Sequence, residues 1–167
     1  MDTKKSLSEA ASEQKGDSSA EMVVWDEKYD TGITLIDDQH KMLVSLINQL
    51  HQACRNGNVV ETTFVQVLHR VVEYVKLHFT TEQQVMEKMK YPGIKEHKKE
   101  HEILVNKIFE TAKNFNDGKR FVPHNFARSL REWVLSHIAV IDKQYALYAA
   151  EQKRKGINLE IFKELKI

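Results

Sequence analysis

The sequence is poor in the residues that break helices and in cysteine. Its six glycines and two prolines among 167 residues amount to about 5% of the chain, compared with roughly 12% in an average protein. So few breakers favour long helices joined by few turns. The single cysteine, Cys54, has no partner for an intramolecular disulfide, which excludes a disulfide-stapled fold and predicts a reducing, cytoplasmic location.

The sequence also lacks an excess of charge and long apolar runs. Lys+Arg number 25 and Asp+Glu number 24, for a formal net charge of +1, and a chain so evenly charged is not expected to bind nucleic acid. No run reaches the roughly 18 apolar residues of a membrane-spanning helix. The first residues lack the apolar core of a secretory signal. We therefore expect neither nucleic acid nor a membrane as a partner.

Three segments are expected along the chain. Residues 1–21 are rich in Ser, Ala and charge, and such a stretch buries too little apolar surface to offset the entropy of ordering, so we predict a disordered tail. Residues 22–151 carry the apolar patterns of a folded domain. Residues 152–167 form a C-terminal extension, in which 158–165 predict a short amphipathic helix.

Four stripes of apolar residues spaced by three and four divide the domain into helices. The first begins near residue 38 and the fourth continues to about Glu151, with breaks at 55–58, 91–93 and 116–118. Residues 22–37 are expected to form an extended lead-in over one end of the helices. Helices joined by short loops pack most simply side by side, so the sequence predicts an all-α fold, an antiparallel up-down-up-down four-helix bundle.

Polar residues occupy places on these stripes where leucine is typical. Residues four apart on a helix face the same way, which makes His78 with Glu82, and His97 with His101, two pairs that each point at one spot. Burying such groups costs several kcal/mol unless something satisfies them, and a metal ion does so. The candidate metal ligands, drawn from all four helices, are His40, His78, Glu82, His97, His101, His137 and Asp142.

Asp142 has the weakest geometric case among these candidates. It follows His137 by five residues, which on an ideal helix places it about 140° away. Either a wide turn of the π type corrects the phase, as is common at functional sites, or Asp142 is a surface acid. Spacing alone leaves both interpretations open.

Three further histidines are not expected to bind metal. His51 is on the face of His40 but about 16 Å further along the helix, and we expect it to be buried or half-buried in the core. His69 precedes His78 by nine residues, which places it half a turn out of phase on the same helix, so it should face solvent. His124 lies about 19 Å from His137 on the fourth helix.

The donor set indicates two metal ions. Five imidazoles and two carboxylates exceed the four positions of a tetrahedral zinc ion. Two octahedral ions bridged by both carboxylates and by an oxide or hydroxide would leave one position open, on the ion with fewer histidines, and this position suits a small diatomic ligand. The donors suit iron, although manganese, cobalt and zinc remain compatible. With only two anionic side chains, oxygen carriage is favoured over oxygenation. Apolar side chains expected to wall the open position are Leu43, Phe79 and Leu135.

Five segments of the chain resemble the hemerythrin family, and specifically its single-domain bacterial members. Order, spacing and residue type agree over residues 22–145 in Trp25-Asp26 with Thr31-Gly32-Ile33, IDDQHK (36–41), HFTTE (78–82), HKKEH (97–101) and HIAVID (137–142). The resemblance implies a non-heme di-iron centre that binds O₂ reversibly. It further implies that His97, His101 and His137 hold one iron, that His40 and His78 hold the other, and that Glu82 and Asp142 bridge them. The resemblance thus favours Asp142 as a ligand.

The expected function is oxygen carriage, storage or scavenging, with O₂ as the partner and no catalysis. Two other classes of function are compatible with the same site. One is a module that senses oxygen, iron or redox state and signals through helix movement. The other is a redox enzyme that reduces peroxide or nitric oxide at the open iron. The rates of O₂ release, of spontaneous oxidation and of turnover would separate the three.

Overall fold

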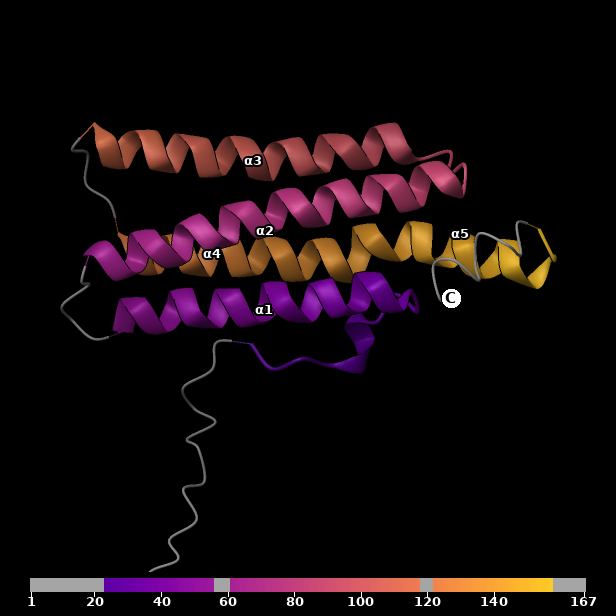
Figure 1. The fold of residues 1–167 in the computed structure, drawn as a ribbon, viewed down its shortest axis with the longest axis horizontal. Coiled ribbons are helices and arrows are strands. Elements are labelled where there is room, and N and C mark those ends of the chain that lie inside the picture. Colours follow the sequence, from indigo (N-terminus) through magenta and orange to yellow (C-terminus); the bar gives the residue numbers. More distant parts are fainter. Residues whose placement is uncertain (1–22, 56–60, 118–121, 158–167) are drawn as a thin grey trace, which may run out of the picture.

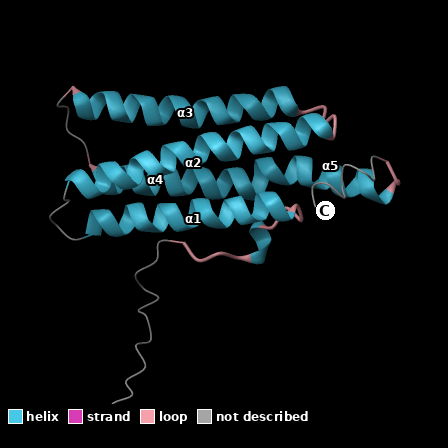
Figure 2. Cartoon of the chain, in the orientation of Figure 1, coloured by secondary structure: helices cyan, strands magenta, loops and turns pink. Residues whose placement is uncertain are grey.

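Four helical rods lie side by side and alternate in direction along the chain (Figure 1). The computed structural model describes residues 23–55, 61–117 and 122–157, and all regular structure within them is helical (Figure 2). The first three rods are α1 (Thr34–Arg55), α2 (Glu61–Lys88) and α3 (Ile94–Asn116). The fourth runs without a break through α4 (Pro123–Ser136), the π-helix η3 (His137–Asp142) and α5 (Lys143–Arg154). The predicted all-α bundle is confirmed.

The predicted ends of the chain's segments can be compared only in part with the structure. The fourth rod ends at Arg154 rather than near Glu151. The predicted tail at 1–21 and the predicted helix at 158–165 lie outside the described residues. Among the described helices, none is both long enough and apolar enough to cross a membrane.

The lead-in to the bundle is shorter than predicted, because α1 begins at Thr34 and not near residue 38. The reason is Asp37, whose carboxylate accepts hydrogen bonds from the backbone N–H (2.6 Å) and the hydroxyl (2.7 Å) of Thr31, and from the N–H of Gly32 (3.1 Å). Gly32 has a φ of +78°, a conformation that glycine adopts without strain. These bonds fix the turn that precedes the helix and let the first turn of α1 form earlier.

The remaining lead-in lies along α1 (Figure 1). Its one helical turn is the 3₁₀-helix η2 (Glu27–Tyr29). Val23 is tied to Asn48 of α1 by two hydrogen bonds, from its N–H to Oδ1 (3.0 Å) and from Nδ2 to its carbonyl oxygen (2.8 Å). The lead-in therefore packs along the side of α1 as far as Asn48, and not over one end of the helices as predicted.

Two apolar clusters fill the interior and lie on either side of a polar layer. The larger cluster contains Tyr29 of the lead-in and buried apolar residues of all four rods. On α1 these residues lie between Leu43 and Leu50, on α2 between Phe64 and Phe79, and on the fourth rod between Phe126 and Ile138. The smaller cluster contains Ile33, Ile36, Val85, Met86, Met89, Tyr145 and Ala149. On each of α1, α2 and the fourth rod, the predicted metal ligands fall in the sequence between members of the two clusters. The polar layer is thus shielded from water at both ends.

Candidate metal centre

The seven predicted ligands come together in the polar layer. Each is buried, with at most 4% of its surface exposed. The ligand atoms form two groups in which every atom lies within 4.8 Å of the others, and Glu82 belongs to both groups. One group is Glu82, His97, His101 and His137, and the other is His40, His78, Glu82 and Asp142.

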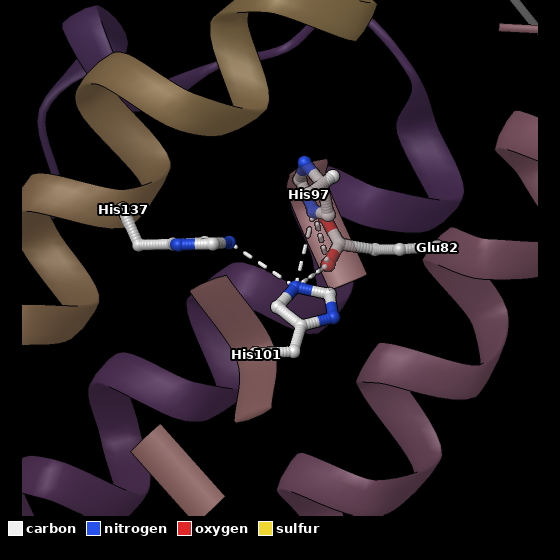
Figure 3. A group of neighbouring side chains, drawn as sticks. All are labelled: Glu82, His97, His101 and His137. Carbon is white, nitrogen blue, oxygen red and sulfur yellow. Dashed lines mark hydrogen bonds and ion pairs between the residues drawn. The ribbon is translucent and has the colours of Figure 1, made fainter. Parts of the chain in front are cut away.

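The first group contains three imidazoles that point at one another and at Glu82 (Figure 3). Nε2 of His101 lies 3.0 Å from Nε2 of His97, 3.1 Å from Nε2 of His137 and 3.0 Å from Oε2 of Glu82. Helix α3 supplies two of these rings from positions four apart, as the spacing predicted. The arrangement concentrates nitrogen and oxygen donors around one small volume.

The second group has two imidazoles and both carboxylates. Nε2 of His78 lies 3.4 Å from Oε2 of Glu82, and Nε2 of His40 lies 3.3 Å from Oδ2 of Asp142. The other oxygen of Asp142, Oδ1, lies 3.1 Å from Nε2 of His137. The two oxygens of Asp142 therefore face different groups of histidines, which is the orientation expected of a bridging carboxylate.

The π-helix η3 explains how Asp142 reaches the centre. His137 and Asp142 are the first and last residues of this six-residue segment, and a π turn widens the helix so that residues five apart face the same way. Asp142 is fully buried. Of the two interpretations that spacing left open, the wide turn is correct and the surface acid is wrong.

The environment favours the charge states that ligands need. Burial lowers the pKa of His78 to about 4 and also lowers the pKa of His101, so both imidazoles are neutral near pH 7. Burial acts to raise the pKa of Glu82, but the facing His78, His101 and His97 hold the pKa well below its usual value. Neutral imidazoles and an ionised carboxylate are the forms that bind metal.

Unsatisfied polar atoms show that a cation fits this layer. Within the described part of the chain, no hydrogen-bond partner is found for either ring nitrogen of His40, for Oε2 of Glu82 or for either oxygen of Asp142. Buried polar atoms are normally paired, and buried carboxylates are normally paired with a charge or bound to metal. Imidazole and carboxylate donors are a set that iron accepts. The residues present therefore fit the implied pair of metal ions.

Tyr145 of α5 supports the carboxylate that the two groups share. Its hydroxyl donates a hydrogen bond of 2.7 Å to Oε1 of Glu82, and the side chain is fully buried. Burial, together with the nearby carboxylates Glu82 and Asp142, raises the pKa of Tyr145 well above its usual value. The phenol therefore remains a neutral donor and fixes one oxygen of Glu82, while Oε2 faces the histidines. Tyr145 was not among the site residues predicted from the sequence.

Replacing Tyr145 by phenylalanine is expected to destabilise the metal-free protein by about 1–3 kcal/mol, because a buried oxygen of Glu82 loses its donor. The free energy of unfolding in urea measures this effect. The matched control is Tyr148→Phe on the same helix, since its hydroxyl lies at the longer distances of 3.5 and 3.4 Å from the carbonyl oxygens of Met89 and Lys90. Equal losses in the two variants would contradict the role given to Tyr145.

Aromatic rings cover several of the imidazoles. Phe79 lies flat on His101, with ring centroids 3.5 Å apart and planes at 2°. Trp133 stacks on His137 at 4.4 Å and 17°. These stacks restrict the rotation of two rings of the three-histidine group and keep water from their faces.

The remaining histidines lie away from the centre. His69 is exposed, as predicted, and His51 is half-buried, as predicted. The rings of His51 and His124 lie 5.3 Å apart, and neither belongs to the two ligand groups. Helical phase and distance along the helices, taken together, predicted which five of the eight histidines of the chain cluster in the two groups and which three do not.

Comparison with known proteins gives one consistent family. Residues 31–149 match the hemerythrin HHE cation binding domain. The bacteriohemerythrin of Methylococcus capsulatus is 33% identical over 118 residues, which cover 71% of this chain and 88% of that protein. The bacteriohemerythrin of Stenotrophomonas maltophilia is 30% identical over 125 residues, 75% of this chain and 80% of that protein. The crystal structure of a wild-type hemerythrin aligns with a TM-score of 0.69 and 31% identity, covering 75% of this chain and 95% of that one.

Proposed function

Because the chain belongs to the hemerythrin HHE cation binding family, we propose that it binds O₂ reversibly at a pair of iron ions held by its seven buried ligands. One iron would be held by the three-histidine group and the other by the two remaining histidines. Glu82 and Asp142 would bridge the two ions. The ligands assigned to the individual ions are His97, His101 and His137 for the first, and His40 and His78 for the second.

The observation that carries the proposal is the asymmetry between the two groups. Three imidazoles cluster with Glu82 in one group, and two cluster with Glu82 and Asp142 in the other group. When bound, the two iron ions, joined by an oxide or hydroxide bridge, supply an open coordination position and the electrons that reversible O₂ binding requires. With fewer imidazoles, the second group is where an open position would be expected.

The chain's own residues keep the centre ordered and dry. The two apolar clusters close the polar layer at both ends. Tyr145 fixes Glu82, and the ring of Phe79 holds His101 in place. Such an environment binds O₂ without offering water or a proton donor from solvent, which favours release of the ligand unchanged.

Three apolar residues are proposed to wall the O₂ position. Leu43 and Phe79 are buried, with 4% and 7% exposed, and Leu135 is half-buried against the larger cluster. Phe79 reaches both groups, because its ring centroid lies 5.9 Å from that of His78 as well as 3.5 Å from that of His101.

An iron count and absorption spectra test the proposed function. The purified protein should contain two irons per chain, and its visible spectrum should change on adding O₂ and return on removing it, over many cycles. A carrier releases O₂ unchanged, whereas a reductase would consume reductant and bleach. Fewer than two irons per chain, or an irreversible change, would overturn the proposal.

Leu135→Ala is expected to keep both irons but to speed spontaneous oxidation of the O₂-loaded protein several-fold, because the shorter side chain admits water to the O₂ position. The decay of the O₂-dependent absorption measures the rate. Leu147→Ala in α5 is the control, since Leu147 is 70% exposed and lies outside the proposed wall. An unchanged rate in Leu135→Ala would show that this leucine does not protect the position.

We also infer that the chain is a binding protein rather than an enzyme and that it works in the cytoplasm. Its free thiol, Cys54, is half-buried, and a reducing compartment keeps such a thiol from oxidising. Sustained turnover with peroxide or nitric oxide would contradict the first inference.

A further inference from the structure

The side chain of Gln39 links α1 to a ligand on α2. Its Oε1 lies 3.0 Å from Nδ1 of His78, and its Nε2 donates a hydrogen bond of 3.1 Å to the hydroxyl of Thr81. That hydroxyl in turn donates to the carbonyl oxygen of Leu77 at 2.9 Å. The result is a relay of three hydrogen bonds that begins at a backbone carbonyl and ends at an imidazole.

The direction of this relay decides which nitrogen of His78 carries the proton. A backbone carbonyl only accepts, so the Thr81 hydroxyl must donate to Leu77 and is left to accept from the amide NH₂ of Gln39. The amide oxygen then faces Nδ1, which must be the protonated nitrogen. The competing acceptor on the other nitrogen is Oε2 of Glu82, but it lies 3.4 Å from Nε2, beyond the usual range of about 2.7–3.2 Å for an N–H···O hydrogen bond. A neutral imidazole has one proton, and these distances place it on Nδ1, which leaves the lone pair of Nε2 directed at the centre.

We propose that Gln39, held by Thr81, is a positioning residue that fixes His78 as the Nδ1–H tautomer with Nε2 free to bind metal on the two-histidine side. The inference rests on the proposed metal centre. Gln39 also directly precedes His40, the other imidazole of that group. It is therefore linked to one histidine of the group through the backbone and to the other through a hydrogen bond. The partners that orient metal-bound histidines in proteins are usually of this kind, a carbonyl, carboxylate or water on the second nitrogen.

His78 is distinguished from other ligands in this respect. Within the described part of the chain, Nδ1 of His40 and Nδ1 of His101 have no hydrogen-bond partner. The protein thus selects the tautomer by a side chain at His78, on the side where the open position is proposed. An amide is also a neutral acceptor, and it draws the imidazole proton less strongly than a carboxylate would.

Nitrogen NMR of the metal-free protein tests the proposal directly, because the two ring nitrogens of a neutral imidazole have well-separated shifts. Wild-type His78 should show the Nδ1–H form. Gln39→Met removes the acceptor at similar length, and His78 should then populate the Nε2–H form. Gln39→Glu restores an acceptor and should restore Nδ1–H, while Thr81→Val, which frees the amide, should give a mixture.

Metal affinity supplies the second measurement. Cobalt(II) titrated into the metal-free protein should bind about 10–100-fold more weakly at one of two sites in Gln39→Met, as is typical when the partner of a metal-binding histidine is lost. Gln39→Glu should recover most of that affinity. The control is Gln49→Met. Gln49 also lies on α1 and accepts a hydrogen bond of 2.9 Å from α2, but its partner there is Arg70, which is not in either ligand group.

The outcomes separate this inference from the proposed function. An Nε2–H form in the wild type, or an unchanged tautomer in Gln39→Met, would overturn the role of Gln39 even if two irons bind. A wild-type chain that binds fewer than two metal ions would overturn the metal centre, while the NMR spectrum still reports the relay. Equal losses of affinity in Gln39→Met and Gln49→Met would indicate a general effect on packing and also contradict the proposal.

Discussion

Glu82→Ala is expected to abolish iron binding at both positions of the centre. Glu82 is the one residue common to the two ligand groups, and its Oε2 lies 3.0 Å from Nε2 of His101 and 3.4 Å from Nε2 of His78. If Glu82 is the proposed bridge, each ion would lose a ligand without it and the pair would lose a bridge. Iron analysis after anaerobic loading should fall from two per chain to near zero.

Thermal or urea unfolding gives an independent measurement of this loss. A metal present at a hundred times its dissociation constant stabilises the folded state by about 2.7 kcal/mol, so loading should raise the stability of the wild type and leave that of Glu82→Ala unchanged. The control is Glu87→Ala on the same helix, because Glu87 is exposed and pairs with Lys98 at 3.1 Å. Stoichiometric iron in Glu82→Ala would show that this carboxylate is not a bridge.

His101→Ala and His78→Ala are expected to lose stoichiometric two-iron binding in complementary ways. His101 belongs to the three-histidine group alone and His78 to the other group alone, so each variant leaves one group intact and should hold at most one iron per chain. Metal analysis measures the stoichiometry, and spectra of the two variants should differ because different donors remain.

A third histidine variant gives the matched control. His69 lies on α2, like His78, but is exposed, and His69→Ala should bind two irons as the wild type does. If His101→Ala and His78→Ala both retained the full di-iron content, the ligand assignment would be wrong. A loss in His69→Ala as large as in His78→Ala would point instead to a general effect of replacing a histidine on this helix.

Much of the fold and of the centre could be predicted from spacing. Pairs four residues apart, such as His97 and His101, face one way on any α-helix, and rods with short connections leave few ways to pack. His69, half a turn out of phase with His78, is exposed as its helical phase predicted. These features depend on helical periodicity, which local sequence determines, and so they needed no knowledge of long-range contacts.

What the sequence did not reveal depends on particular side-chain hydrogen bonds, one set local and the others between segments far apart in the chain. The start of α1 follows from hydrogen bonds of Asp37 to Thr31 and Gly32, which spacing rules do not include. Tyr145 and Gln39 act through partners on α2 that are 63 and 39 residues away. A tyrosine or a glutamine beside a ligand has many alternative orientations, and only the assembled bundle selects one.

Grafting this centre onto another helical scaffold would require the whole six-residue π-helix η3 and not only its two ligands. On a straight α-helical host, an acid five residues after the histidine would point about 140° away from the metals. The side chains that follow, Tyr145 among them, take their direction from the widened turn as well. Deleting one residue from η3 would restore ideal α-helical geometry but would rotate every residue that follows it. A designer would then have to reposition the second half of the helix, including the Tyr145 phenol that supports Glu82.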